Sequence, residues 1–228
     1  MKRNALYYFY IIALLYVIGA VFDGVAIYNH SKGYTKDKSG YVEILNFEDR
    51  LLNVEEWMFT GSGWDSKEST STEKLKGSEA HYATAVISSY YFIASSAAFI
   101  LMVLFIYWGG SNVFKAVGLS VITIAIACLI IGIITPMLEI EAFSTNLTIP
   151  LKFTLPFIGN VDIPDKVFEG RMYYYYQSKS VVDLVYVLLE SKNYVVAVSI
   201  FGFSVLVPFT KLTLSVLLLL NSSFRDNS

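Results

Sequence analysis

The sequence predicts an all-α membrane protein: a four-transmembrane-helix bundle with a small extracytoplasmic β-element and amphipathic helices in its loops. Hydrophobic residues make up 55% of the 228 residues and charged residues 16%, whereas an average soluble domain carries about 25% charged residues. The mean hydropathy is +0.53. Several apolar stretches exceed about 18 residues, which is long enough to cross the roughly 30 Å hydrocarbon core of a bilayer.

The apolar stretches define four spans and two long loops. Tyr and Trp residues lie near several span ends, as is typical of side chains at the lipid headgroups. We expect one membrane domain over residues 1–228, with transmembrane helices at 6–28, 82–108, 116–138 and 194–220 and loops at 29–81 and 139–193. The apolar run of the first span is too long for the core of a signal peptide, so we expect it to be retained as a helix.

The charges of the short segments predict the orientation. The N-terminal segment, residues 109–115 and the C-terminal tail hold Lys2, Arg3, Lys115 and Arg225 against one acid, Asp226. Basic residues in short segments remain cytoplasmic, whereas long loops are translocated largely regardless of charge. We therefore expect both termini in the cytoplasm and both long loops outside it.

The two long loops differ in pattern. In the first loop we expect a soluble stretch over 30–40, an amphipathic helix over 41–59 and a flexible Ser/Thr/Lys/Glu-rich segment over 65–79. In the second loop, apolar residues alternate with more polar ones over 147–155, which indicates a strand. Pro150 and Pro156 confine that strand to an edge or to short pieces.

The second loop continues with a turn, a strand and a short helix. Gly159-Asn160 is typical of a turn, and residues 166–178, with four consecutive tyrosines, favour a second strand. Residues 180–190 carry apolar side chains on one helical face. Ser180 is a candidate N-cap of this helix, and Asp183 at the third position would complete an acidic variant of the capping box.

Lys211 is the most informative charge within the spans. It lies about ten residues, roughly 15 Å, from the cytoplasmic end of the fourth span. A charge there costs at least about 2.5 kcal/mol, so such residues usually face a bundle interior or a cavity. The alternative is a lysine that extends to the inner headgroups. Pro208, one turn earlier, is expected to kink the helix and to free a carbonyl near Ser204.

Depth along the helices suggests polar neighbours for Lys211. Ser95 and Ser96 in the second span and Thr123 in the third could approach it if their faces turn inward; alternatively, the two serines serve close helix packing. Three further residues are secondary candidates near the outer ends of spans: Asp23 in the first, and Pro136 with Glu139 after the third. Glu139 is expected to stabilise a solvent-facing loop rather than to bind an ion.

The sequence offers no enzyme motif. It contains no Ser/His/Asp set, no HExxH and no phosphate-binding glycine loop. One cysteine, Cys128, and two histidines, His30 and His81, are too few for a convincing metal site. The net charge of −2, without a basic block, argues against nucleic-acid binding. We therefore expect no enzymatic activity, no cofactor and no metal.

Two motifs in the second half of the chain resemble a known family. One is a short amphipathic helix followed by a span that carries Ser204-x-x-x-Pro208-x-x-Lys211-Leu212. The other is an apolar helix end, Ile133-Ile134-Thr135-Pro136, followed by Glu139. Together they resemble the transmembrane module of the paraquat-inducible protein A family. The resemblance covers residues 113–220 and is only topological over 1–112.

The resemblance implies a multi-pass protein of the bacterial inner (cytoplasmic) membrane. Members of the family work beside MCE-domain proteins and are implicated in moving lipids between envelope membranes, with Lys211, Pro208 and Ser204 matching the motif of a transport or proton-coupled core. Members typically have two modules and zinc ribbons. This chain has one module and no ribbon, so either a homo-oligomer supplies the second module or the chain has a function other than lipid transport.

Three functions follow as hypotheses. The first is a membrane component of a lipid-transport system that binds membrane lipids and an MCE-type partner. The second is an auxiliary or scaffold membrane protein that binds a partner through its extracytoplasmic loops. The third is a transporter of a small solute or ion, which one intramembrane lysine without a clear acidic partner disfavours.

Overall fold

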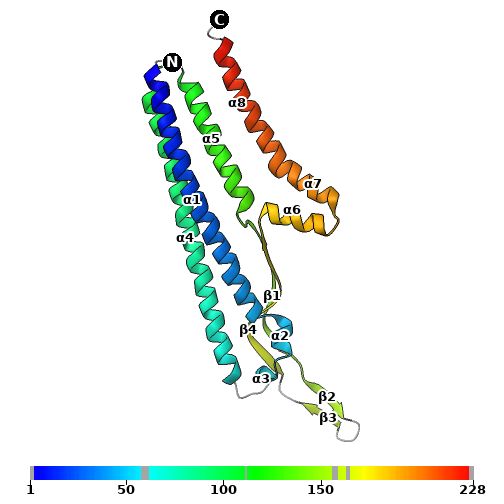
Figure 1. The fold of residues 1–228 in the computed structure, drawn as a ribbon. Coiled ribbons are helices and arrows are strands. Elements are labelled where there is room, and N and C mark those ends of the chain that lie inside the picture. The colour runs from blue at the N-terminus through cyan, green and yellow to red at the C-terminus, as the bar shows by residue number, and fades with distance from the viewer. Residues whose placement is uncertain (1–2, 58–61, 111, 156–158, 163–164, 226–228) are drawn as a thin grey trace. The chain divides into compact units, whose positions relative to one another are not determined.

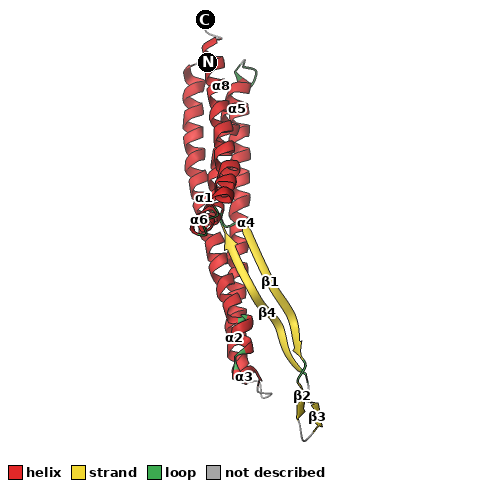
Figure 2. Cartoon of the chain, turned by 90° about the vertical axis from the view of Figure 1, so that its right-hand side faces the viewer, coloured by secondary structure: helices red, strands yellow, loops and turns green. Residues whose placement is uncertain are grey.

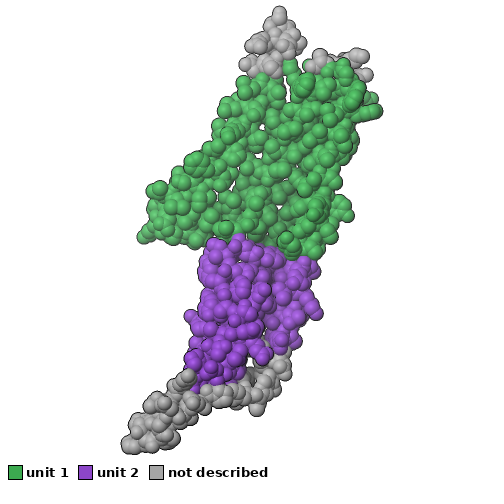
Figure 3. All heavy atoms as spheres, turned by 180° about the vertical axis from the view of Figure 1, so that it is seen from behind, with its two compact units in different colours: residues 1–32, 81–138, 179–228 green, residues 33–80, 139–178 purple. Residues whose placement is uncertain are grey.

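The computed structural model describes residues 3–57, 62–110, 112–155, 159–162 and 165–225. The chain divides into two compact units (Figure 3). Unit 1 comprises Met1–Lys32, His81–Leu138 and Lys179–Ser228, and unit 2 comprises Gly33–Ala80 and Glu139–Ser178. Each unit has its own buried cluster of hydrophobic side chains.

The long helices confirm the mainly helical prediction. They are α1 (Arg3–Ile44), α4 (Ser62–Ile106), α5 (Val113–Ile134) and a last helix in which α7 (Tyr194–Phe201) continues through η1 (Gly202–Leu206) into α8 (Val207–Arg225). In the described ranges, four helical stretches are long and apolar enough to cross a membrane. Within unit 1, α1 begins and α8 ends at the same end of the bundle (Figure 1), as an even number of crossings requires.

The core of unit 1 joins α1 to α4. Tyr16 stacks on Phe99 with ring centroids 4.5 Å apart and an interplanar angle of 5°, and Phe9 meets the ring of Tyr107 edge-on. The buried residues of α1 recur at intervals of seven and four, which is the period of one helical face. They are Phe9, Tyr16, Ala20 and Ile27, opposite Phe92, Phe99 and Val103 of α4 and Tyr107, the residue after α4.

Two segments of the first loop are helical, contrary to our expectation. Residues 30–40, expected as a soluble stretch, continue α1, and residues 65–79, expected as flexible, belong to α4. In unit 2 these polar extensions pack closely: Lys74 forms an ion pair with Asp37 at 3.6 Å, and a Cβ on Gly77 would lie 2.7 Å from a carboxylate oxygen of Asp37. The composition of 65–79 indicated flexibility because it does not reveal this long-range packing.

The expected amphipathic helix over 41–59 is divided. Residues 41–44 end α1, and α2 (Phe47–Leu51) and α3 (Val54–Trp57) follow as short helices, while residues 58–59 lie outside the described part. Asn46 caps α2 because its side-chain oxygen accepts a hydrogen bond from the main-chain N–H of Glu48 at 2.9 Å. A hydrogen-bonded cap between two helical segments explains why one continuous helix does not form.

The strands of unit 2 form, within the described ranges, two two-stranded sheets. β1 (Leu138–Ile149) pairs with β4 (Lys166–Lys179), and β2 (Lys152–Leu155) pairs antiparallel with β3 (Gly159–Asp162), with Leu155 opposite Gly159 (Figure 2). The predicted strand 166–178 is therefore confirmed. The predicted strand 147–155 is interrupted at Pro150, and the turn expected at Gly159-Asn160 is wrong, because both residues pair within β3.

The core of unit 2 surrounds Tyr173 of β4. This tyrosine is fully buried and packs with Tyr41 and Val42 at the end of α1 and with Leu45, which follows the helix. Its main-chain N–H donates to the carbonyl of Leu45 at 2.9 Å. Burial raises the pKa of Tyr41, and the neighbouring phenol of Tyr173 adds to this shift. The run of four tyrosines thus supplies the central core residue of the unit.

The predicted capping box at α6 (Val181–Glu190) is confirmed. The hydroxyl of Ser180 accepts from the main-chain N–H of Asp183 at 3.1 Å, and the carboxylate of Asp183 accepts from the main-chain N–H of Ser180 at 3.1 Å. The hydrogen bonds from Ser180 hold the pKa of Asp183 below its ordinary value. Two main-chain donors at the helix start are thereby satisfied.

Removing this cap is expected to loosen α6. Ser180→Ala should destabilise the helix by about 1 kcal/mol, seen as faster hydrogen exchange of its first-turn amides. One carboxylate oxygen of Asp183 accepts from both the main-chain N–H and the hydroxyl of Ser180, and an ionised acceptor makes stronger hydrogen bonds than a neutral one. Protection should therefore persist at neutral pH and fall as the pH drops through the lowered pKa of Asp183, below the ordinary value of 3.8. Ser191→Ala at the other end of α6 is the control, and equal exchange in both variants would contradict the role of the cap.

Candidate functional site

The last long helix contains a main-chain irregularity beside its proline. The N–H of Val207 donates to the carbonyl of Gly202, five residues earlier, so that η1 is a π-helical segment. Pro208 follows directly and has no N–H to offer the carbonyl of Ser204, four residues earlier. Single π-helical turns inside α-helices occur frequently at functional sites. The irregular hydrogen bonding therefore lies around Ser204 and Pro208, where the sequence predicts a disturbance of the helix.

Lys211 lies one turn beyond Pro208 and is exposed on the surface of unit 1. Across the described ranges, its side chain makes no hydrogen bond or ion pair. The structure thus places the ammonium on the outer face of an apolar helix and not in the interior of the isolated chain. If this helix lies in a membrane, the ammonium would be stabilised by a polar or anionic group from outside the chain, such as a lipid headgroup to which the side chain extends.

The hydroxyls around Lys211 bond to the helix itself. Thr210, Thr213 and Ser215 each donate to the carbonyl four residues earlier, at 2.7, 2.9 and 2.9 Å. Such bonds satisfy main-chain acceptors and tend to bend a helix. Because these hydroxyl protons are already donated within the helix, the ammonium of Lys211 is the group on this part of α8 with which a ligand could pair.

Ser95 and Ser96 do not approach Lys211. The hydroxyl of Ser96 donates to the carbonyl of Phe92 at 2.8 Å and makes a buried 2.9 Å hydrogen bond with the hydroxyl of Tyr16. Ser95 donates to the same carbonyl at 3.0 Å and lies 3.4 Å from the carboxylate of Asp23. These contacts join α4 to α1, because the buried faces of those two helices meet. The sequence did not indicate Tyr16 as a partner of Ser96, because this contact depends on which helices lie side by side.

Thr123 also lies apart from Lys211. Its hydroxyl donates to the carbonyl of Leu119 at 2.9 Å, and the residue lines an apolar cavity of about 300 Å³ between α1 and α5. The expected convergence of Ser95, Ser96 and Thr123 on Lys211 is therefore absent from the structure. Each of these hydroxyls bonds to a carbonyl of its own helix, three or four residues earlier, which removes the need for a lysine partner.

Pro136 and Glu139 lie at the end of α5 and in β1. The helix ends at Ile134, and Pro136 follows outside it, as its missing N–H favours. In unit 2, Glu139 accepts hydrogen bonds from the hydroxyl of Tyr34 at 2.9 and 3.0 Å, and Glu141 pairs with Lys38 at 3.0 Å. Both acids therefore fasten β1 to the extension of α1.

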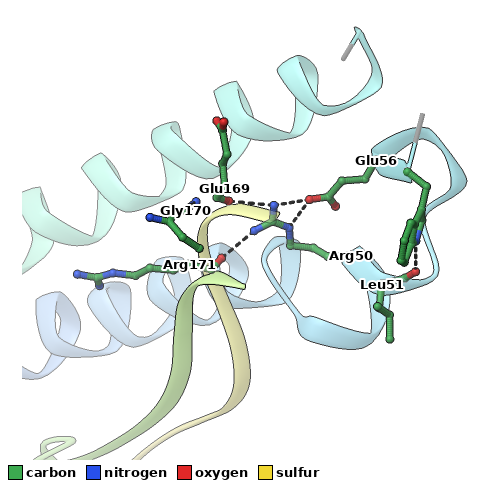
Figure 4. A network of polar contacts seen from close by, with 8 residues as sticks. Arg50, Leu51, Glu56, Glu169, Gly170 and Arg171 are labelled. Carbon is green, nitrogen blue, oxygen red and sulfur yellow. Dashed lines mark hydrogen bonds and ion pairs between the residues drawn. The ribbon is translucent and has the colours of Figure 1, made fainter. Parts of the chain in front are cut away.

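A buried arginine in unit 2 is the site that sequence reasoning missed (Figure 4). Arg50 is 2% exposed. Its Nε donates to Glu56 at 2.8 Å and its Nη2 donates to the same oxygen, while the carbonyls of Arg171 and Glu169 each accept at 3.0 Å. The network fastens α2 and α3 to β4. Nothing in the sequence pairs Arg50 with residues about 120 positions away.

Comparison with known proteins gives one match. Residues 167–228 match the family model described as Paraquat-inducible protein A. This segment contains nearly all of β4, then α6, α7, η1 and α8, and so includes Ser204, Pro208 and Lys211. No curated protein and no solved structure matches the chain. The resemblance predicted from the sequence is confirmed for residues 167–228.

Proposed function

We propose that this chain is a multi-pass protein of the bacterial inner (cytoplasmic) membrane that takes part in lipid transport between envelope membranes, together with an MCE-domain protein. The observation that carries the proposal is the family match over residues 167–228, which includes a π-helical, proline-containing helix with an exposed lysine. The proposed role is non-enzymatic and uses neither a cofactor nor a metal.

The four apolar helices support insertion into a membrane. Each is long enough to cross it, and the basic residues of the short segments favour cytoplasmic termini. In this orientation unit 2 lies on the periplasmic side, where a periplasm-spanning partner could contact it. A second copy of this chain is proposed to provide the other half of a two-module arrangement.

In the proposed function, the ammonium of Lys211 binds the lipid headgroup. An ammonium exposed on an apolar helix is stabilised if the anionic headgroup of a lipid reaches it. The π-helical turn and Pro208 interrupt the regular hydrogen-bond ladder beside it. A helix interrupted at this point can bend there at low cost, so that the lysine can follow a headgroup as it moves.

A scaffold function is the alternative, and one observation favours it. Unit 2 has its own buried core and the buried Arg50 network, so its two loop segments form a folded unit that could offer a defined binding surface. If the chain only binds a partner, activity should depend on unit 2 and not on Lys211.

Lipid distribution tests the proposal directly. Deleting the gene from its own bacterium should change the phospholipid content of the separated inner and outer membranes, and the full chain should restore it. Photo-crosslinkers placed in unit 2 should capture an MCE-domain protein. Unchanged membranes in the deletion strain, or a reporter fused after Ser228 that reads outside, would contradict the proposed role or orientation respectively.

A further inference from the structure

We propose that the cavity between α1 and α5 binds one acyl chain of a lipid from the periplasmic leaflet. This inference rests on the proposed transport function and gives it a substrate site outside the segment that matches the family. The cavity has a volume of about 300 Å³. Six residues of α1 and six of α5 line it: Tyr16, Val17, Ala20, Val21, Gly24, Val25, Thr123, Ile126, Ala127, Ile130, Ile131 and Ile134.

The chemistry of the wall selects hydrocarbon. Tyr16 and Thr123 are the two lining residues with a polar side-chain group. The hydroxyl of Tyr16 is bonded to Ser96 at 2.9 Å, and that of Thr123 to the carbonyl of Leu119 at 2.9 Å. A polar ligand would find no charged partner here and would lose its solvation without compensation. An alkyl chain loses nothing and gains close contacts.

The length of the cavity corresponds to one leaflet. Its lining runs over residues 16–25 of α1 and 123–134 of α5, which is about 14 Å and 16 Å at 1.5 Å per residue. A bilayer core is about 30 Å thick, so each leaflet contributes about 15 Å. Residues 16–25 lie toward the outer end of the span predicted at 6–28, and residues 123–134 form about the last three turns of α5 (Val113–Ile134). With the N-terminus in the cytoplasm, the cavity therefore lies in the periplasmic leaflet.

The width suits an alkyl chain. A volume of about 300 Å³ over about 15 Å leaves a mean cross-section of about 20 Å². Carbon atoms in contact lie about 4 Å apart, so an alkyl chain is about 4–5 Å wide and fits inside the groove. A helix about 10 Å in diameter has a cross-section of about 80 Å², so it could lie along the groove but not enter it.

The cavity is open along one side. Val21 and Ile130 are among its lining residues and are exposed on the surface of unit 1, so a chain can enter laterally from the bilayer. At its base the two helices are in close contact through small residues. Ala20 is buried, and a Cβ on Gly24 would lie 3.1 Å from the side chain of Ile131, so a larger residue at Gly24 would press against α5.

Native mass spectrometry of the full chain released from detergent micelles tests the site. The wild-type chain should retain one phospholipid. Ala127→Phe, which fills the groove, should lower the retained fraction at least about tenfold, because the bound chain loses several buried methylenes. Cys128→Phe is the matched control, since Cys128 is the next residue, is exposed and does not line the cavity.

A second pair of variants guards against misfolding. Val21→Phe adds bulk to an exposed lining residue of α1, whereas Ile18→Phe adds it to an exposed residue outside the lining. Val21→Phe should lower lipid retention and Ile18→Phe should not. Equal retention in all four variants, or an equal loss in lining and control variants, would show nonspecific surrounding lipid only and would overturn the inference. A retained second copy in place of lipid would also overturn it.

The outcome is separable from that of the proposed function. If groove variants lose lipid while deletion of the gene leaves the membranes unchanged, the chain binds an acyl chain but does not transport lipid. If the gene is required for the lipid distribution while groove variants retain lipid normally, the transport function stands and the acyl-chain site is rejected.

Discussion

Lys211→Met is expected to abolish the restoration of lipid distribution in a deletion strain, although the chain still inserts at the wild-type level. Methionine keeps an unbranched apolar side chain but removes the exposed ammonium, and with it the group proposed to attract an anionic headgroup. Removing an intramembrane charge should aid insertion, so a loss of activity would not reflect a loss of protein. The measurement is complementation normalised to the amount of protein in the membrane fraction.

Two further variants define what the lysine contributes. Lys211→Arg keeps the charge and should retain partial activity, because the guanidinium has a different shape and hydration from an ammonium. Thr213→Val removes a hydroxyl from the same helix that donates to the carbonyl of Phe209, four residues earlier, and this variant should remain near wild type. Full activity of Lys211→Met would reject the transport role and favour the scaffold alternative.

The parts of the fold that the sequence predicts correctly are those that depend on local interactions. The capping box at Ser180 and Asp183 involves residues three positions apart, and the apolar spans depend only on runs of hydrophobic residues. The interruption at Pro208 is likewise local, because a missing N–H acts within the same helix. These features need no knowledge of which helix lies beside which.

The parts that the sequence does not predict depend on distant pairings. Ser96 faces Tyr16, 80 positions away, and Arg50 donates to main-chain carbonyls 119 and 121 positions away. The polar extensions of α1 and α4 have the composition of loops. Their helical structure depends on packing between them, as at the close contact of Gly77 with Asp37. Counting residues along the helices placed Ser95 at about the same membrane depth as Lys211. Such a count does not show toward which neighbouring helix a side chain points, so it could not identify Asp23 as the neighbour of Ser95.

Arg50→Met is expected to destabilise unit 2 by about 3–5 kcal/mol, the cost of leaving one member of a buried ion pair without its partner. The side chains of Arg50 and Glu56 are 2% and 6% exposed. The second carboxylate oxygen of Glu56 is buried and has no hydrogen-bond partner among the described residues. Without Arg50, that carboxylate would lose its ion-pair partner and the carbonyls of Glu169 and Arg171 would each lose a hydrogen-bond donor.

Trp57 provides the probe for this loss. Its ring meets Phe168 edge-on at 5.3 Å and its indole N–H donates to the carbonyl of Leu51, so its fluorescence reports on the α2, α3 and β4 contact. In a background with Trp64 and Trp108 replaced by phenylalanine, urea unfolding should shift to a clearly lower midpoint for Arg50→Met, at unchanged slope.

The matched control is Arg171→Met, because Arg171 is exposed and lies over the ring of Phe143 at 4.9 Å. An exposed cation of this kind contributes only about 0.5–1 kcal/mol, so its midpoint should move little. Arg50→Met combined with Glu56→Leu should recover part of the loss, since no buried charge is then left without a partner. If Arg50→Met and Arg171→Met were equally mild, the buried pair would not be what holds α2 and α3 to β4.

The same variant separates partner binding from lipid binding. If Arg50→Met unfolds unit 2 and also ends capture of the MCE-domain protein while lipid retention in the groove persists, partner binding and lipid binding belong to different parts of the chain.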